Sequence, residues 1–161
     1  MKKEVKNTEG ALRWIVNILR KHDIPFRISG GFAARIYGST RELADIDIGM
    51  KKNYFPEIFP EIKKYLISGP EIHKDNEWNI FAATLNYQGQ DIDIYPIDSL
   101  KFFNKKEQRW ENLKHTFSNI VFREAYNMKL PIISRPYLIE YKSKLRRKVD
   151  LSDIKELSKV N

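Results

Sequence analysis

The tetrapeptide Asp-Ile-Asp-Ile occurs twice in this chain, at residues 45–48 and 91–94. Because alternate side chains of a β-strand point to opposite faces, each copy predicts a strand with its isoleucines in the core and its aspartates on the other face. Aspartates two residues apart then lie about 6–7 Å from each other along the strand. We expect the two strands to be neighbours in one mixed sheet, with their carboxylates converging at one end.

A glycine pair precedes the first copy. Residues 26–29 are apolar enough for a short buried strand, which runs into Gly30 and Gly31 and then into a short helix over FAARIYG. Without side chains in the way, the backbone N–H groups at this junction can approach a phosphate closely. A glycine pair alone also fits a simple tight turn, so its interpretation depends on the aspartates that follow.

The remaining pattern predicts an α+β fold, a small mixed sheet flanked by helices. An amphipathic helix is expected over residues 8–22 with Thr8 as its cap, and a hairpin over 78–87 and 90–97. A second hairpin is expected over 120–126 and 129–133, whereas 101–118 gives no clear pattern. Helices are expected over 136–147 and from Asp150 or Ser152 to Lys159. We predict one domain over residues 1–161, with its core at about 24–98 and a C-terminal helical segment at about 134–160.

Composition narrows the function classes. The chain has no cysteine, which excludes disulfides and thiolate zinc sites, and it has neither a signal-like apolar run nor a transmembrane-length segment. We therefore expect a cytoplasmic protein without a membrane partner. A net charge of +8 attracts nucleotides or RNA, although solvated lysines alone would give the same charge. The densest basic run is residues 142–148.

Clustered carboxylates raise one another's pKa, so a divalent cation is their natural neutraliser. Oxygen ligands favour magnesium or manganese over zinc. A single pair of aspartates on a strand is often only the solvated face of a sheet. Two copies together with the glycine pair favour phosphoryl chemistry instead.

These motifs resemble the nucleotidyltransferases with a DNA-polymerase-β-like fold, in which an apolar strand ends in a glycine pair, two aspartates follow, and a later strand adds one more acidic residue. The resemblance implies that Asp45 and Asp47 are catalytic metal ligands, with Asp93, or alternatively Asp91, as the third. The segment 93–97 is similar to that of lincosamide-type enzymes, which favours Asp93. The resemblance also implies nucleotide binding by a further set of residues: Gly30, Gly31, Arg41, and either Lys142 or Lys144.

The implied activity moves a nucleoside monophosphate from an NTP, with ATP expected, to a hydroxyl group. The acceptor is left open among a small molecule, an RNA 3′ end and a protein. Two alternatives keep the same fold: a non-catalytic module that binds nucleotide or nucleic acid, and a toxin–antitoxin component with a partner protein. Arg41 stands in a polar loop, where an arginine is often merely solvated.

Overall fold

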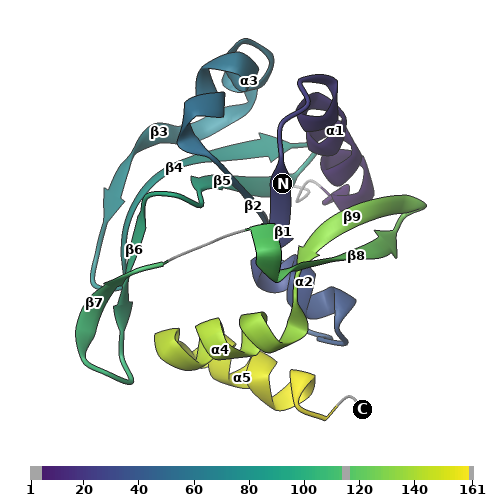
Figure 1. Ribbon diagram of the computed structural model, residues 1–161. Helices are drawn as coiled ribbons and strands as arrows, with labels where there is room; N and C mark the ends of the chain where they lie inside the picture. Colours follow the sequence, from purple (N-terminus) through teal and green to yellow (C-terminus); the bar gives the residue numbers. More distant parts are fainter. Residues whose placement is uncertain (1–4, 114–116, 160–161) are drawn as a thin grey trace.

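A nine-stranded mixed β-sheet runs through the computed structural model, which describes residues 5–113 and 117–159 (Figure 1). The helices are α1 (Thr8–Lys21), α2 (Gly30–Ile36), α3 (Phe55–Ile62), α4 (Arg135–Leu145) and α5 (Lys148–Leu157). The strands are β1 (Phe26–Ser29), β2 (Asp45–Met50), β3 (Leu66–Lys74), β4 (Trp78–Tyr87), β5 (Gln90–Pro96), β6 (Leu100–Asn104), β7 (Arg109–Asn112), β8 (Ile120–Ala125) and β9 (Met128–Ile133). Short 3-10 turns lie at Lys52–Tyr54, Lys63–Tyr65 and Phe117–Asn119.

The order of strands across the sheet is β7-β6-β4-β5-β2-β1-β9-β8. Strands β5 and β6 pair with two halves of one edge of β4, and β3 pairs with the opposite edge. The pairs β2–β5 and β1–β9 are parallel, while the remaining pairs are antiparallel. The two Asp-Ile-Asp-Ile strands are therefore neighbours, as predicted, and their register sets Asp45 beside Asp91 and Asp47 beside Asp93.

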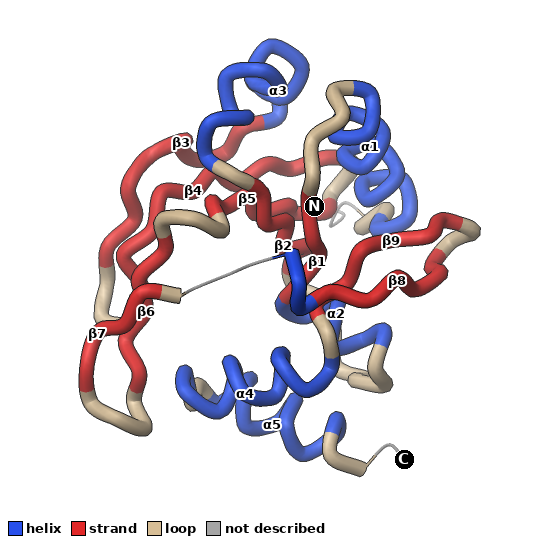
Figure 2. The backbone as a smooth tube through the Cα atoms, viewed as in Figure 1, coloured by secondary structure: helices blue, strands red, loops and turns tan. Residues whose placement is uncertain are grey.

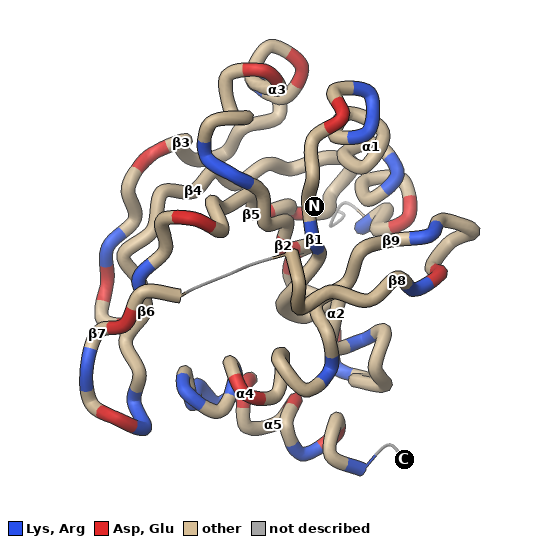
Figure 3. The backbone as a smooth tube through the Cα atoms, viewed as in Figure 1, with Lys and Arg blue, Asp and Glu red and all other residues tan. Residues whose placement is uncertain are grey.

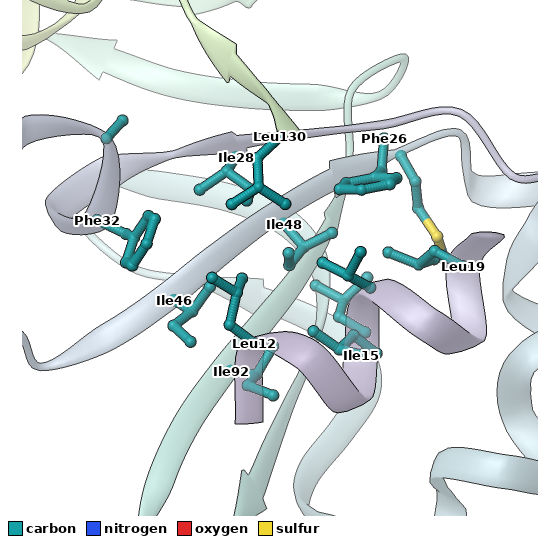
Figure 4. Packing of buried hydrophobic residues seen from close by; sticks show 14 of the residues in the cluster. Leu12, Ile15, Leu19, Phe26, Ile28, Phe32, Ile46, Ile48, Ile92 and Leu130 are labelled. Carbon is teal, nitrogen blue, oxygen red and sulfur yellow. The ribbon is translucent and has the colours of Figure 1, made fainter. Parts of the chain in front are cut away.

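The isoleucines of both copies lie in the core. Ile46, Ile48 and Ile92 are fully buried and pack with the apolar stripe of α1, including Leu12 and Ile15 (Figure 4). Burial of one such side chain stabilises the fold by about 1.5–3 kcal/mol. Because side chains alternate between the two faces of a strand, the aspartates of both copies lie on the opposite face from these isoleucines.

The C-terminal helices α4 and α5 lie side by side (Figure 2). They lie on the aspartate side of the sheet, because α4 packs against β6 and α2, and the charge of its Lys142 acts on Asp47. The expected α+β class, the mixed sheet and the C-terminal helices are thus confirmed.

Several boundaries differ from the predictions. The cap of α1 is Asn7, whose side chain accepts a hydrogen bond from the Gly10 N–H, and not Thr8, which is the first helical residue. The last helix starts at Lys148, because the Asp150 side chain accepts the N–H of Arg147 in a capping box, instead of starting at Asp150 or Ser152. Residue 160 of the predicted helical segment lies outside the described residues.

The sheet is also larger than predicted. Strand β3 was not predicted, since its residues are mostly exposed and it contains Gly69 and Pro70 together with register shifts. Strands β6 and β7 lie in the segment that gave no clear pattern. Among the described residues, no helix is long and apolar enough to cross a membrane.

Candidate active site

Three carboxylates meet on the polar face of β2 and β5. One carboxylate oxygen from each of Asp45, Asp47 and Asp93 lies within 4.8 Å of the others. Asp91 is not part of this group and instead accepts a hydrogen bond from Asn86 at 2.8 Å. The convergence follows from the parallel register, which aligns equivalent positions of the two motifs.

The three charges are only partly compensated. Burial raises the pKa of Asp47 well above its usual range, and the charges of Asp45 and Asp93 add to the effect, although Lys142 and Arg147 oppose it. Burial also raises the pKa of Asp93 to about 6, against a hydrogen bond that the Thr84 hydroxyl donates at 2.6 Å. The protein therefore holds these carboxylates together at a cost in free energy that a cation would relieve.

This donor set fits a divalent metal. All the ligands are carboxylate oxygens, which suit magnesium or manganese, and the spacing lets one ion contact oxygens from two strands. The raised pKa of Asp47 and Asp93 indicates negative charge that the surrounding protein leaves partly unneutralised. Their assignment as metal ligands stays a prediction.

The glycine pair lies directly beside this cluster. Gly30 has a φ of +62°, and a Cβ placed on it would lie 1.8 Å from Asp47 Oδ2, so only glycine fits here. A Cβ on Gly31 would lie 2.8 Å from Arg41 Nη2. The β1–α2 junction therefore lies next to both Asp47 of the carboxylate group and the Arg41 guanidinium.

The predicted basic residues have different surroundings. Arg41 donates to Asp153 of α5 from Nε at 2.7 Å and from Nη2 at 3.1 Å. Lys142 is 2% exposed and pairs with Asp150 at 3.2 Å and Asp153 at 2.9 Å. Lys144 is one-third exposed and pairs with Glu111 and Glu140 near the β6–β7 hairpin. Since the charge of Lys142 acts on Asp47, Lys142 is the lysine that the fold brings to the site.

Two contacts in the site were not predicted from the sequence. Thr84 donates its hydroxyl to Asp93 from the neighbouring strand β4, where the pairing sets these two residues opposite each other. Asp153 holds Arg41 from a position 112 residues away. The hairpin prediction already contained the signal for Thr84, because it fixes the residue opposite Asp93, whereas nothing local in the sequence pairs Arg41 with Asp153.

The fold is that of solved nucleotidyltransferase structures. A Thermotoga maritima protein, TM1012, provisionally described as a nucleotidyltransferase, superposes with a TM-score of 0.72 at 19% identity over 94% of both chains. The lincosamide antibiotic adenylyltransferase LnuA, solved with lincomycin, has a TM-score of 0.64 at 19% identity, over 96% of this chain and 98% of its own.

The enzyme ANT(2")-Ia, solved in complex with adenylyl-2"-tobramycin, has a TM-score of 0.60 at 13% identity, over 94% of this chain and 88% of its own. No protein-family model matches the chain, and no curated protein matches it in sequence. At these identities the likeness establishes the fold, and it confirms the predicted nucleotidyltransferase fold.

Proposed function

We propose that this protein is a metal-dependent nucleotidyltransferase that transfers a nucleoside monophosphate from an NTP to a hydroxyl acceptor. The observation that carries the proposal is the group formed by Asp45, Asp47 and Asp93, whose oxygens lie within 4.8 Å of one another beside a glycine pair. On a merely solvated sheet face, three crowded carboxylates would only repel one another, and no packing against a backbone that only glycine can adopt would be required.

Asp45, Asp47 and Asp93 would hold one or two magnesium or manganese ions. Such ions polarise phosphoryl oxygens and neutralise charge that develops during transfer. The chain's own contribution is positioning. The N–H groups at Gly30 and Gly31 hold phosphate oxygens, and Arg41 and Lys142 supply positive charge on the pyrophosphate side. Asp93 accepts the proton of the attacking hydroxyl, which suits a carboxylate whose pKa burial has raised to about 6.

ATP is the proposed nucleotide, because one structural neighbour is an adenylyltransferase and another was solved with an adenylylated product. Those neighbours were solved with lincomycin and with adenylylated tobramycin, which supports a small hydroxylated acceptor. The net charge of +8 keeps an RNA 3′ end as the second candidate acceptor. A cytoplasmic location remains a prediction.

Thermal unfolding with and without magnesium and ATP tests the proposal. We expect magnesium plus ATP to raise the melting temperature of the wild type, because a ligand that binds only the folded state stabilises it. Asp47→Asn and Asp93→Asn should remove this shift and lower transfer of labelled nucleotide by about a thousandfold or more, since each deletes several kcal/mol of charge stabilisation.

Asp91→Asn is the matched control for Asp93→Asn. Both aspartates are on β5, but Asp91 lies outside the group of three carboxylates. Asp91→Asn should keep both the shift and the activity. Loss of activity in Asp91→Asn with retention in Asp93→Asn would instead make Asp91 the third ligand. A wild type that magnesium and ATP leave unstabilised would favour a non-catalytic basic module.

A further inference from the structure

Arg41 is tied to the C-terminal helix by a bidentate ion pair. Its Nε and Nη2 donate to the two carboxylate oxygens of Asp153, which is 1% exposed. Two parallel N–H···O bonds fix the plane of a guanidinium as well as its position. The Arg41 side chain is 27% exposed, so Asp153 is the buried partner of the pair and part of the guanidinium remains accessible.

The accessible part of the Arg41 guanidinium faces the candidate site. Nη2 lies against Gly31, where a Cβ would approach it to 2.8 Å, and the negative charge of Asp45 acts on the same guanidinium. A guanidinium carries five N–H donors. Asp153 takes two of them and the Glu42 carbonyl a third, at 3.4 Å. The remaining two can point to an anionic group beside the glycine pair.

Asp153 is itself held in place. Lys142 donates to its Oδ2 at 2.9 Å, and the Ser39 hydroxyl donates to its Oδ1 at 3.3 Å. Lys142 also pairs with Asp150, which caps the start of α5. The anchor of Arg41 therefore belongs to a buried polar network that fixes the first turns of α5, so Arg41 needs little ordering when a ligand arrives.

We propose that Asp153 is a positioning residue for nucleotide binding, which fixes the Arg41 guanidinium beside Gly31 so that it contacts the β- and γ-phosphates. The proposal rests on the nucleotidyltransferase function above and extends it to α5, which supplies no catalytic carboxylate. Its distinguishing consequence is that Asp153 acts on phosphate binding through Arg41, because Lys142 keeps a second partner in Asp150. An ion pair that merely stabilises the fold would act on unfolding and leave phosphate selectivity unchanged.

The test is a double-mutant cycle on the full chain, with magnesium ATP and AMP as calorimetric ligands. Arg41→Ala and Asp153→Asn should each raise the Kd of ATP about ten- to a hundredfold, the range for hydrogen bonds to charged groups. The Kd of AMP should change by less than about threefold, since AMP lacks the β- and γ-phosphates. The double variant should match Arg41→Ala, because positioning has no effect without the positioned group.

Glu61→Gln is the matched control. Glu61 also bridges two elements by pairing with a cation, Lys21 of α1, but its helix α3 contacts α1, which packs with the isoleucines of the sheet. It should leave both Kd values unchanged. Wild-type affinity in Asp153→Asn, additive effects in the double variant, or equal losses for AMP and ATP would each overturn the positioning role.

Asp153→Asn weakens the pairing of the buried Lys142, so this variant could fail to fold. Arg41→Lys then decides, because it keeps the charge and leaves Asp153 with Lys142, yet an ammonium cannot form the bidentate pair. We expect an ATP Kd about tenfold above wild type, and a wild-type Kd would refute the proposal. A wild type that binds no magnesium ATP would refute the proposed function itself, whereas wild-type binding with unchanged variants refutes only the role of Asp153.

Discussion

Two groups of crowded aspartates lie on the same side of the sheet and have opposite electrostatics. On β2 and β5, Asp45, Asp47 and Asp93 face one another, and the pKa values of Asp47 and Asp93 are raised. On α5, Asp150 and Asp153 are almost completely buried, yet each accepts hydrogen bonds from cationic side chains. Figure 3 shows acidic and basic residues interleaved along α4 and α5.

Burial alone would raise the pKa of Asp153, but the hydrogen bonds from Arg41 and Lys142 outweigh it and hold that pKa below its usual range. The difference teaches how to tell a ligand site from a structural network. A network that serves the fold satisfies its own charges, whereas a site that awaits a cation leaves part of its charge unmatched.

The comparison is tested most strongly by removing one carboxylate from each group. Asp150 accepts from Lys142 and from Arg147. Asp150→Ala should therefore lower the free energy of unfolding by about 3–5 kcal/mol, as for other broken buried ion pairs. Asp47→Asn should leave that free energy unchanged or raise it in metal-free buffer, because it relieves repulsion.

Urea unfolding at neutral pH with a chelator measures both changes. A loss of similar size in the two variants would mean that the β2–β5 carboxylates are also matched by the protein, and the distinction between the groups would fail.

The pH dependence of stability should separate the groups next. The folded-state pKa of Asp93 is about 6, against 3.8 for the free side chain, so the native state binds this proton more tightly. Its contribution to stability therefore falls as pH rises from about 4 to about 6, by about 3 kcal/mol in total. The pKa of Asp153 is lowered, so its contribution is present above its ordinary pKa and is lost as pH falls below it.

Melting temperatures of wild type and Asp93→Asn, recorded from pH 4 to 7 without metal, should show this. The melting temperature of the variant should exceed that of the wild type most near neutral pH, and the two melting temperatures should converge at pH 4. A constant difference between the two curves would contradict a raised pKa at Asp93.

Much of the candidate site follows from short-range sequence pattern. The alternation in both Asp-Ile-Asp-Ile motifs is enough to assign faces, since burial stabilises isoleucine, whereas a buried aspartate needs a partner for its charge. The glycine pair and the strand before it were predicted with the right bounds, because Phe26–Ser29 is a short apolar run ended by glycine.

The parts that the sequence left open depend on partners far along the chain. The sequence offers both Lys142 and Lys144, and the packing of α4 on α5 buries Lys142 between two aspartates. The ion pair of Arg41 with Asp153 is equally distant in sequence. Strand β3 was missed for another reason, since its exposed residues, including Ile67 and Ile72, give no alternation between core and solvent.

The smallest expected effect comes from one hydroxyl in each group. Ser39 donates to Asp153, and Thr84 donates to Asp93. Ser39→Ala should cost about 0.5–1.5 kcal/mol of stability and leave the pH profile unchanged, because Arg41 and Lys142 still hold Asp153 charged. Thr84→Val should instead raise the pKa of Asp93 further, since the lost hydrogen bond favoured the charged form.

Protons would then compete better with magnesium for Asp93 in Thr84→Val. Stabilisation by magnesium, followed as the shift in melting temperature, should be weaker than in wild type at pH 7 and should recover at higher pH, while Thr84→Ser should behave as wild type. Equal pH profiles for Ser39→Ala and Thr84→Val would mean that the two hydroxyls have the same effect on the pKa of the aspartates to which they donate. A shift confined to Thr84→Val supports the view that only the β2–β5 carboxylates are held with their charge unmatched, since only there does one neutral donor decide the protonation state.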